Sequence, residues 1–319
     1  MSDHPTNDQT TQIEVQEPDA GKRLDKVVVG AFGSRIGRAR VRALFEQGAV
    51  RVDGHVARKG DAARVGSVIT VALPAPLDDA AVAQPGAALD VRLEREDLVV
   101  VCKPAGQPTA PLRGGETGTV VNALLARYPE MRGFGYSARE PGIVHRLDTD
   151  TSGLLVAARS AISFDELSRA LHAGEIHKSY LLLCDGTDLA DTGLVEIPLC
   201  PHPKDKRRVL ACVHPRDQAR YSPRPASTSY RVLRRSGRLA LVEATASKAA
   251  RHQIRAHMAA IGHPLLGDKL YGGRTDTAQR HALHAYHVAW RGSASVPAFD
   301  VRDEIPAAFL ELLDSDDRG

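Results

Sequence analysis

The order of apolar and polar positions divides the chain into a short helical region and a longer region rich in strands. From Lys22 onward, apolar residues recur at the spacing that puts them on one face of a helix. A second amphipathic helix is predicted over 37–47. Short strands are predicted at 49–52 and 65–71. The pattern therefore predicts two helices packed on a small sheet.

Beyond residue 88 the pattern changes to short apolar runs separated by turn residues. Strands are predicted at 91–93, 98–102, 153–158, 179–184, 227–233, 239–245 and 282–290. Helices are predicted at 119–128, 162–172, 251–261 and 306–313. Mostly antiparallel strands with a few peripheral helices indicate an α+β fold.

Composition shifts mark the expected domain boundaries. Residues 1–17 are polar and acidic and lack apolar periodicity, so we expect a disordered tail. A small module is expected at 18–74 and a Pro- and Ala-containing linker at 75–88. The remaining residues, 89–319, are expected to form the main domain.

Overall composition excludes several classes of protein. Of 319 residues, 43% are hydrophobic, which is enough for a substantial core. Apolar runs are too short to cross a membrane, and the first residues lack the pattern of a signal peptide, so we expect a cytoplasmic protein. The four cysteines form no CxxC pair, which favours reduced structural thiols over zinc or disulfides.

Charge is unevenly distributed along the chain. Residues 1–20 carry five acids and no Lys or Arg, whereas residues 21–74 carry eleven Lys or Arg and four acids. The remaining residues are close to neutral, since the net charge of the chain is +3. A compact basic block beside a neutral body is typical of proteins that bind phosphate backbones, although a solvated basic face would give the same pattern.

The most informative stretch is 145–153, which reads HRLDTDTSG. Turn-forming residues precede an apolar run, so Asp148 is expected in a tight loop beside a buried strand. Arg146 lies two residues away, and a nearby arginine keeps a carboxylate ionised, which suits a nucleophile. An Asp in a polar turn more often caps or closes the turn, so this motif alone decides nothing.

A second motif far along the chain changes that balance. Residues 252–257 read HQIRAH, and the string continues through IGHP at 261–264 to GDKLYGG at 267–273. Both strings, in this order, resemble those of the ribosomal-large-subunit (RluA-type) pseudouridine synthases. In addition, residues 18–74 resemble the S-four-like RNA-binding module that often precedes such a synthase domain.

The resemblance implies roles for four residues. Asp148 corresponds to the essential carboxylate, which attacks the sugar or base or assists proton removal. Tyr180 corresponds to the active-site tyrosine, whose ring can stack on an extruded uracil while its hydroxyl lies near the departing C5 proton; a core aromatic is the alternative. Arg255 is expected to pair with Asp148, or else to form a surface salt bridge. Arg146 is expected to approach the space left by the flipped base, or to contact phosphate.

Further cations are expected to bind RNA. These residues are Lys103, Lys248, Arg251 and His252 in the main domain and Arg38, Arg40 and Arg42 in the small module. The family usually carries Thr-Gly-Arg directly before HQIR, whereas this chain has Lys248-Ala249-Ala250 and then Arg251. Lys248 or Arg251 can replace the missing cation. A basic loop from Lys204 to Arg208 is expected to add phosphate contacts.

No cofactor or metal is expected. The chain lacks a GxxxxGK[ST] loop, and the spacing of its histidines around 252–263 does not place several imidazoles on one helix face. From the resemblance we predict a monomeric RNA pseudouridine synthase, an isomerase acting on ribosomal or transfer RNA. The alternative is an inactive RNA-binding or chaperone-like protein that retains the fold. A glycoside hydrolase using Asp148 and Asp150 is disfavoured, because carboxylates two apart in a turn seldom reach the facing geometry.

Overall fold

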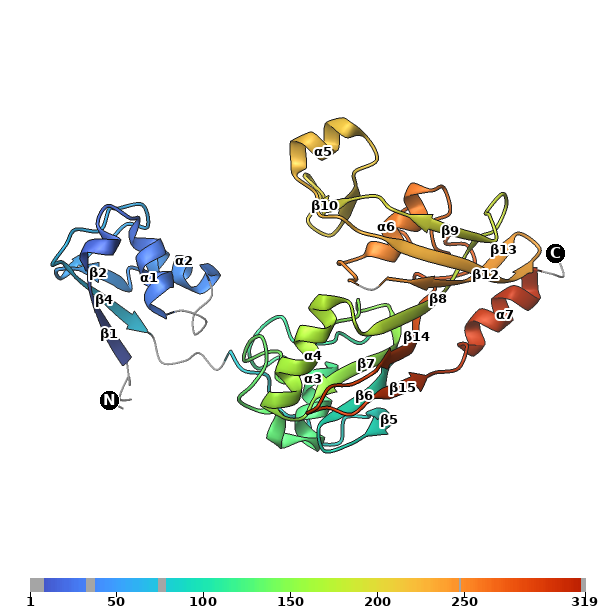
Figure 1. Cartoon of the computed structure of the whole chain (residues 1–319), viewed down its shortest axis with the longest axis horizontal. Coiled ribbons are helices and arrows are strands. Elements are labelled where there is room, and N and C mark those ends of the chain that lie inside the picture. Colours follow the sequence, from blue (N-terminus) through green and yellow to red (C-terminus); the bar gives the residue numbers. More distant parts are fainter. Residues whose placement is uncertain (1–8, 33–37, 74–78, 247, 317–319) are drawn as a thin grey trace, which may run out of the picture. The chain divides into compact units, whose positions relative to one another are not determined.

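The computed structural model describes residues 9–32, 38–73, 79–246 and 248–316. The chain divides into two compact units, Met1–Asp78 and Asp79–Gly319. Figure 1 labels most elements of each unit. The break between the units lies within the segment that we expected to be a linker. The prediction that the first unit is an RNA-binding module is not tested by this division.

The first unit is a small sheet covered by two helices. Its strands are paired antiparallel in the order β1-β4-β2-β3. Their bounds are β1 Gln9–Glu14, β2 Val50–Val52, β3 His55–Val56 and β4 Val68–Leu73, and the helices are α1 Leu24–Phe32 and α2 Arg38–Glu46, with a short 3₁₀ helix at Glu17–Asp19. Leu24, Val27 and Val28 are buried against Ile69 and Val71 of the sheet, as their helical spacing predicts.

The expected disordered tail is wrong for residues 9–14. These residues form β1, which pairs with β4 so that Ile13 lies opposite Ile69. Val15, directly after the strand, is buried at 1% exposure. Two apolar residues in a polar stretch give too little periodicity to predict a strand. The free edge of β4 supplies the pairing that the local sequence does not reveal.

The second unit is built on a nine-stranded mixed sheet. Its path is β5-β6-β7-β14-β8-β13-β12-β9, with β15 paired to β14, and β7 with β14 is the parallel pair. The sheet strands are β5 Asp90–Glu94, β6 Leu98–Lys103, β7 Ser152–Ala158, β8 His177–Asp185, β9 Thr192–Val195, β12 Thr228–Ser236, β13 Leu239–Thr245, β14 Leu283–Trp290 and β15 Phe299–Arg302. The helices are α3 Val120–Arg127, α4 Ala161–Ala173, α5 Pro215–Tyr221, α6 Gln253–Ala260 and α7 Ala307–Asp316, with a 3₁₀ turn at Pro129–Met131.

Strands β6 and β7 are apolar over most of their length because both faces of the sheet are covered. Val99 and Val101 of β6 point into a core that includes α3, whereas Leu98 and Val100 point into a core that includes α4. Strands buried on both faces read as continuous hydrophobic runs. Thr119 is the N-cap of helix α3, and its side chain accepts a hydrogen bond from the backbone of residue 122.

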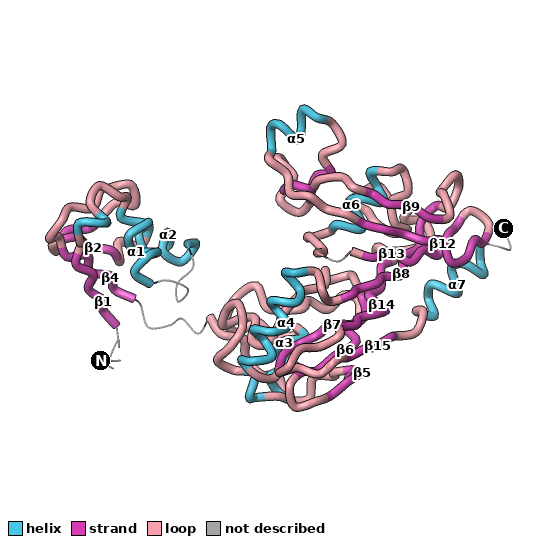
Figure 2. Tube along the Cα trace, in the orientation of Figure 1, coloured by secondary structure: helices cyan, strands magenta, loops and turns pink. Residues whose placement is uncertain are grey.

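The α+β class and the main predicted elements of this unit are confirmed, but the segment 196–227 contains more structure than its sequence predicts. It holds a two-stranded hairpin of β10 Leu199–Pro201 and β11 Val209–Ala211, followed by α5. Figure 2 shows that loops make up much of this region. Its strands are three residues long, too short for an alternating pattern.

No described helix is long and apolar enough to cross a membrane.

Candidate active site

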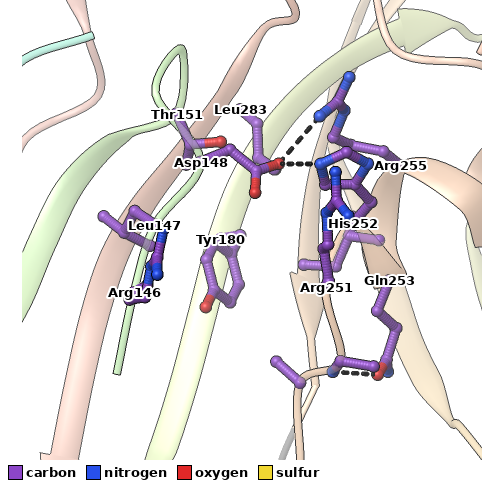
Figure 3. A pocket seen from close by; sticks show the side chains of 13 residues that line it. Arg146, Leu147, Asp148, Thr151, Tyr180, Arg251, His252, Gln253, Arg255 and Leu283 are labelled. Atoms are coloured by element: carbon purple, nitrogen blue, oxygen red, sulfur yellow. Dashed lines mark hydrogen bonds and ion pairs between the residues drawn. The ribbon is translucent and has the colours of Figure 1, made fainter. Parts of the chain in front are cut away.

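Asp148 lies in the loop before β7, on the wall of a pocket of about 110 Å³ (Figure 3). The pocket is lined by Arg146, Leu147, Asp148, Thr151, Tyr180, Ala249, Ala250, Arg251, His252, Gln253, Ile254, Arg255 and Leu283. A larger groove of about 660 Å³ adjoins it and shares Asp148, Arg146, Arg251 and His252. Three segments far apart in sequence thus meet here: the Asp148 loop, strand β8 and the start of α6.

The Asp148 loop is held on both sides by hydrogen bonds. Thr109 Oγ1 donates to the carbonyl of Leu147 at 2.9 Å and accepts from its amide at 3.2 Å. On the other side, Thr151 Oγ1 lies 2.8 Å from His281 Nε2, and Arg280 donates to the carbonyl of residue 150 at 3.2 Å. Because the loop on each side of Asp148 is bonded to another segment, the backbone position from which its carboxylate projects is fixed.

Gly153 allows β7 to run beside β14. Its φ is +111°, and a Cβ at this position would lie 2.2 Å from the carbonyl oxygen of Ala285. A side chain there would both strain the backbone and collide with β14. The glycine that ends the HRLDTDTSG motif is therefore required for the parallel pairing that places the loop over the sheet.

Arg255 bridges Asp148 and a second carboxylate. From α6 it donates through Nη1 to Asp148 Oδ2 at 2.9 Å, and through Nε and Nη2 to Asp268 at 2.7 and 2.9 Å. The side chain of Asp268 has no exposed surface. Burial alone would lower the pKa of Arg255, but the bonds to Asp268 and Asp148 outweigh it and raise this pKa. The charged guanidinium of Arg255 is held by two bonds to Asp268, and its third bond fixes one oxygen of Asp148.

His252 and Tyr271 complete this cluster. His252 has φ of +54° just before α6, which directs its ring to Asp148, with Nε2 at 3.5 Å from Oδ2. Its Nδ1 lies 3.1 Å from the hydroxyl of Tyr271, and the Tyr271 ring lies 5.2 Å from the Arg255 guanidinium carbon. Burial lowers the pKa of His252, so the ring is neutral at neutral pH.

Tyr180 projects from β8 into the same pocket. It is 7% exposed, and Figure 3 shows its ring next to Asp148, Arg146 and Leu147. Burial, assisted by the charge of Asp148, raises the pKa of Tyr180 to about 12. Within the described residues its hydroxyl has no hydrogen-bond partner, and neither does Asp148 Oδ1. A free phenol and a free carboxylate oxygen therefore share one cavity.

Comparison with known proteins identifies the family. Residues 97–260 match the RNA pseudouridylate synthase family. A protein of Chloroflexus aurantiacus named "Uncharacterized RNA pseudouridine synthase" is 38% identical over 278 residues, covering 86% of this chain and 84% of that protein. The chain belongs to the RNA pseudouridylate synthase family.

Other relatives agree with this assignment. The "Ribosomal large subunit pseudouridine synthase D" of Xanthomonas campestris pv. campestris is 33% identical over 299 residues, covering 89% of this chain and 86% of that protein. The structure titled "Human RNA Pseudouridylate Synthase Domain Containing 1" shares the fold, with a TM-score of 0.57 and 24% identity over 73% of this chain and 90% of that one. The predicted RluA-type resemblance and the isomerase class are confirmed, and nothing in these comparisons favours an inactive protein.

The other predicted site residues of the synthase are placed as follows. Arg146 is exposed on the pocket rim and pairs with Glu140 at 2.8 Å, and the cation bound to Asp148 is Arg255, as expected. Arg251 lines both the pocket and the groove, and it donates to the carbonyls of residues 206 and 207 at 3.1 and 2.8 Å. Lys248 is exposed and is not among the lining residues.

Lys103 does not match its predicted role as an RNA contact. Its side chain is completely buried, and Nζ donates to the carbonyls of Pro104, Gln107 and Thr149 at 2.9, 2.7 and 2.9 Å. Burial lowers its pKa to about 8. All three donors of the ammonium group are used inside the protein. Lys103 instead ties the Asp148 loop to the turn after β6.

The three arginines predicted on the first unit are only partly described. Arg42 of α2 is exposed and pairs with Glu46 at 2.8 Å. The side chains of Arg38 and Arg40 lie outside the described part of the structure. Whether these residues contact RNA stays a prediction.

The partners that organise Arg255 are not predicted by the sequence. Asp268 and Tyr271 lie in the GDKLYGG string that supports the family resemblance, but the string by itself indicates no role for either. The sequence shows only that Arg255 lies beside the apolar stripe of a predicted helix. This position indicates an acidic partner but does not show that there are two. Among the described residues, no group of three or more His, Cys, Asp or Glu side chains could hold a metal ion.

Proposed function

We propose that this synthase isomerises uridines of large-subunit ribosomal RNA and that Asp148 is its reacting carboxylate. The observation that carries the proposal is the geometry of Asp148: Arg255 fixes Oδ2, whereas Oδ1 has no described partner in the pocket that also holds Tyr180. The choice of ribosomal RNA draws on relatives named as large-subunit synthases at 30–35% identity. We further propose that the enzyme acts as a monomer in the cytoplasm.

The pocket geometry fits a single nucleoside taken out of an RNA structure. An ionised carboxylate beside the glycosidic bond can attack the sugar or the base, or remove a proton, and each of these begins from the same oxygen. The ring of Tyr180 offers a face on which an extruded uracil can stack. Because its pKa is raised to about 12, the Tyr180 phenol is protonated until a base takes that proton.

In this proposal, cations around the pocket bind the phosphates of the RNA. Arg146 and Arg251 line the pocket and the adjoining groove, where they can neutralise phosphates on either side of the flipped nucleotide. Phosphate contacts give affinity, whereas discrimination of uridine depends on the pocket itself. The first unit is proposed to extend this affinity as an RNA-binding module.

Tritium release provides the direct test. Large-subunit RNA transcribed with uridine tritiated at C5 should lose tritium when the purified protein is added without metal. Asp148→Asn should abolish release while RNA binding stays near that of the parent. Asp150→Asn is the matched control, since only its backbone carbonyl is bonded to the loop-supporting arginine, and it should retain release.

Two results would overturn the proposal. Release that persists in Asp148→Asn would remove Asp148 from the chemistry. Pseudouridine mapping with and without the gene should show sites lost from large-subunit RNA, and sites lost from transfer RNA alone would make the proposed substrate wrong.

A further inference from the structure

A basic hairpin lies next to the active-site helix. We use this name for β10, β11 and the loop 202–208 between them, which carries Lys204, Lys206, Arg207 and Arg208. Strand β11 packs on α6, and Figure 1 shows the hairpin on the same side of the sheet as that helix. The hairpin is therefore an exposed cationic element beside the helix that carries Arg255.

Tyr271 connects this hairpin to the cluster around Asp148. Its hydroxyl accepts a hydrogen bond from the amide of Val209, the first residue of β11, at 2.9 Å. The same hydroxyl lies 3.1 Å from His252 Nδ1. One oxygen thus touches both the backbone of the hairpin and the imidazole that faces Asp148.

The ring of Tyr271 makes a parallel connection. The guanidinium carbon of Arg208, in the hairpin, lies 5.3 Å from the ring centroid, and that of Arg255 lies 5.2 Å from it. Arg208 is half-buried and forms no ion pair with any described residue, and its Nε has no hydrogen-bond partner, so no described carboxylate compensates its charge. Arg251 adds a third connection through the carbonyls of residues 206 and 207.

The hydroxyl of Tyr271 also determines which nitrogen of His252 carries the proton. With Nε2 facing the carboxylate oxygen of Asp148 at 3.5 Å, Nδ1 is the acceptor for the Tyr271 O–H, and this contact is shorter than that of the hydroxyl to the Val209 carbonyl, at 3.1 against 3.4 Å. The proton of the neutral ring then resides on Nε2, which faces Asp148 Oδ2. Without the hydroxyl, no described group holds Nδ1 in the unprotonated state.

From these contacts we propose that Tyr271 is a positioning residue that couples the basic hairpin to Asp148. Phosphate bound at the hairpin keeps Val209 and Arg208 in place, and their contacts with Tyr271 fix the position of its side chain. Tyr271 in turn holds His252 and Arg255, which orient the carboxylate of Asp148. The inference rests on the proposed role of Asp148. Its expected signature is a change in turnover caused by a residue that touches neither the uridine nor Asp148.

The first test measures the His252 tautomer and needs no RNA. In ¹⁵N spectra of the full-length protein, with His252→Gln used for assignment, Nδ1 of His252 should be unprotonated and Nε2 protonated. Tyr271→Phe keeps the ring and should mix the two tautomers. Tyr286→Phe is the matched control, because it also removes one bonded hydroxyl, that to Glu243, and should leave His252 unchanged. An unchanged His252 spectrum in Tyr271→Phe would overturn the inference.

The second test is a double-mutant cycle on tritium release from large-subunit RNA. Tyr271→Phe should lower kcat about tenfold, the effect of one ordinary hydrogen bond, with little change in KM and an unchanged melting temperature. Arg208→Ala should raise KM and also lower kcat. In a Tyr271→Leu background, which lacks the ring as well as the hydroxyl, Arg208→Ala should raise KM alone, because both connections through Tyr271 are already broken.

Failures of the two proposals can be told apart. If kcat falls by the product of the single effects, or if Tyr271→Phe turns over like the parent, the coupling is wrong while Asp148→Asn still abolishes release. If Asp148→Asn retains release, the proposed function fails first, whatever Tyr271 does.

Discussion

The Asp148 loop and the basic hairpin lie close together but are built in different ways. The loop is fixed by side chains from other segments, among them Lys103, Thr109 and Arg280. The hairpin loop exposes Lys204, Lys206 and Arg207, and the described contacts that hold it reach mainly its backbone, from Arg251 and Tyr271. Chemistry on a base needs a carboxylate held within a fraction of an ångström, whereas a phosphate contact needs only a charge nearby.

The largest effect that tests this contrast is expected from Tyr180→Phe. Its ring remains to stack on uracil, but the hydroxyl available for proton removal is lost, so tritium release should fall about 10²–10⁴-fold. RNA carrying 5-fluorouridine has no C5 proton to lose, and on this RNA the variant should match the parent. Equal loss on both RNAs would show that Tyr180 acts before proton removal.

A pH profile sharpens the same prediction. Since the pKa of Tyr180 is raised to about 12, its phenolate fraction rises about tenfold per pH unit below that value. If phenolate removes the C5 proton in the slow step, kcat of the parent should rise with pH through the neutral range. The rise should be absent in Tyr180→Phe, and a rise that persists there would assign the base to another group.

The next largest effect is expected from Arg255→Lys. Lysine keeps the charge but cannot bond Asp148 and both oxygens of Asp268 in one plane, so the carboxylate should shift and kcat should fall at least about 10²-fold. This loss should appear on 5-fluorouridine RNA as well, unlike that of Tyr180→Phe. Arg251→Lys is the matched control from the same motif, and its main effect should be on KM.

Lys103→Met should act on stability and turnover together. The variant removes the donor that the carbonyls of Pro104, Gln107 and Thr149 share, which should destabilise the second unit by about 1–3 kcal/mol. Thermal unfolding should show this loss, and kcat should fall because the Asp148 loop is no longer tied to the turn. A variant of parental stability with weaker RNA binding would restore the role that the sequence predicts for Lys103.

These residues also show how far the sequence could predict the site. Two motifs whose order matches a family predict that Asp148 and Arg255 come together, and the 2.9 Å pair of these residues agrees with that expectation. The role of Lys103 could not be predicted, because it depends on the carbonyl of Thr149, which lies in a loop 46 residues away in sequence. The strand at 9–14 and the hairpin at 199–211 depend on pairing partners rather than local pattern.

The smallest effect on turnover is expected from removing the first unit. Residues 21–74 carry eleven Lys or Arg against four acids, so this unit should supply affinity through counterion release. Deleting residues 1–78 should raise KM for long RNA about tenfold at low salt and leave kcat near that of the parent. The slope of log KM against log salt should flatten by about 0.7–0.9 for each phosphate that the first unit no longer neutralises. In the full chain, the combined Arg38→Gln, Arg40→Gln and Arg42→Gln variant should reproduce part of that change. If the shortened enzyme binds its RNA as tightly and with the same salt dependence, affinity resides in the basic hairpin and the pocket rim instead, and the first unit has another role.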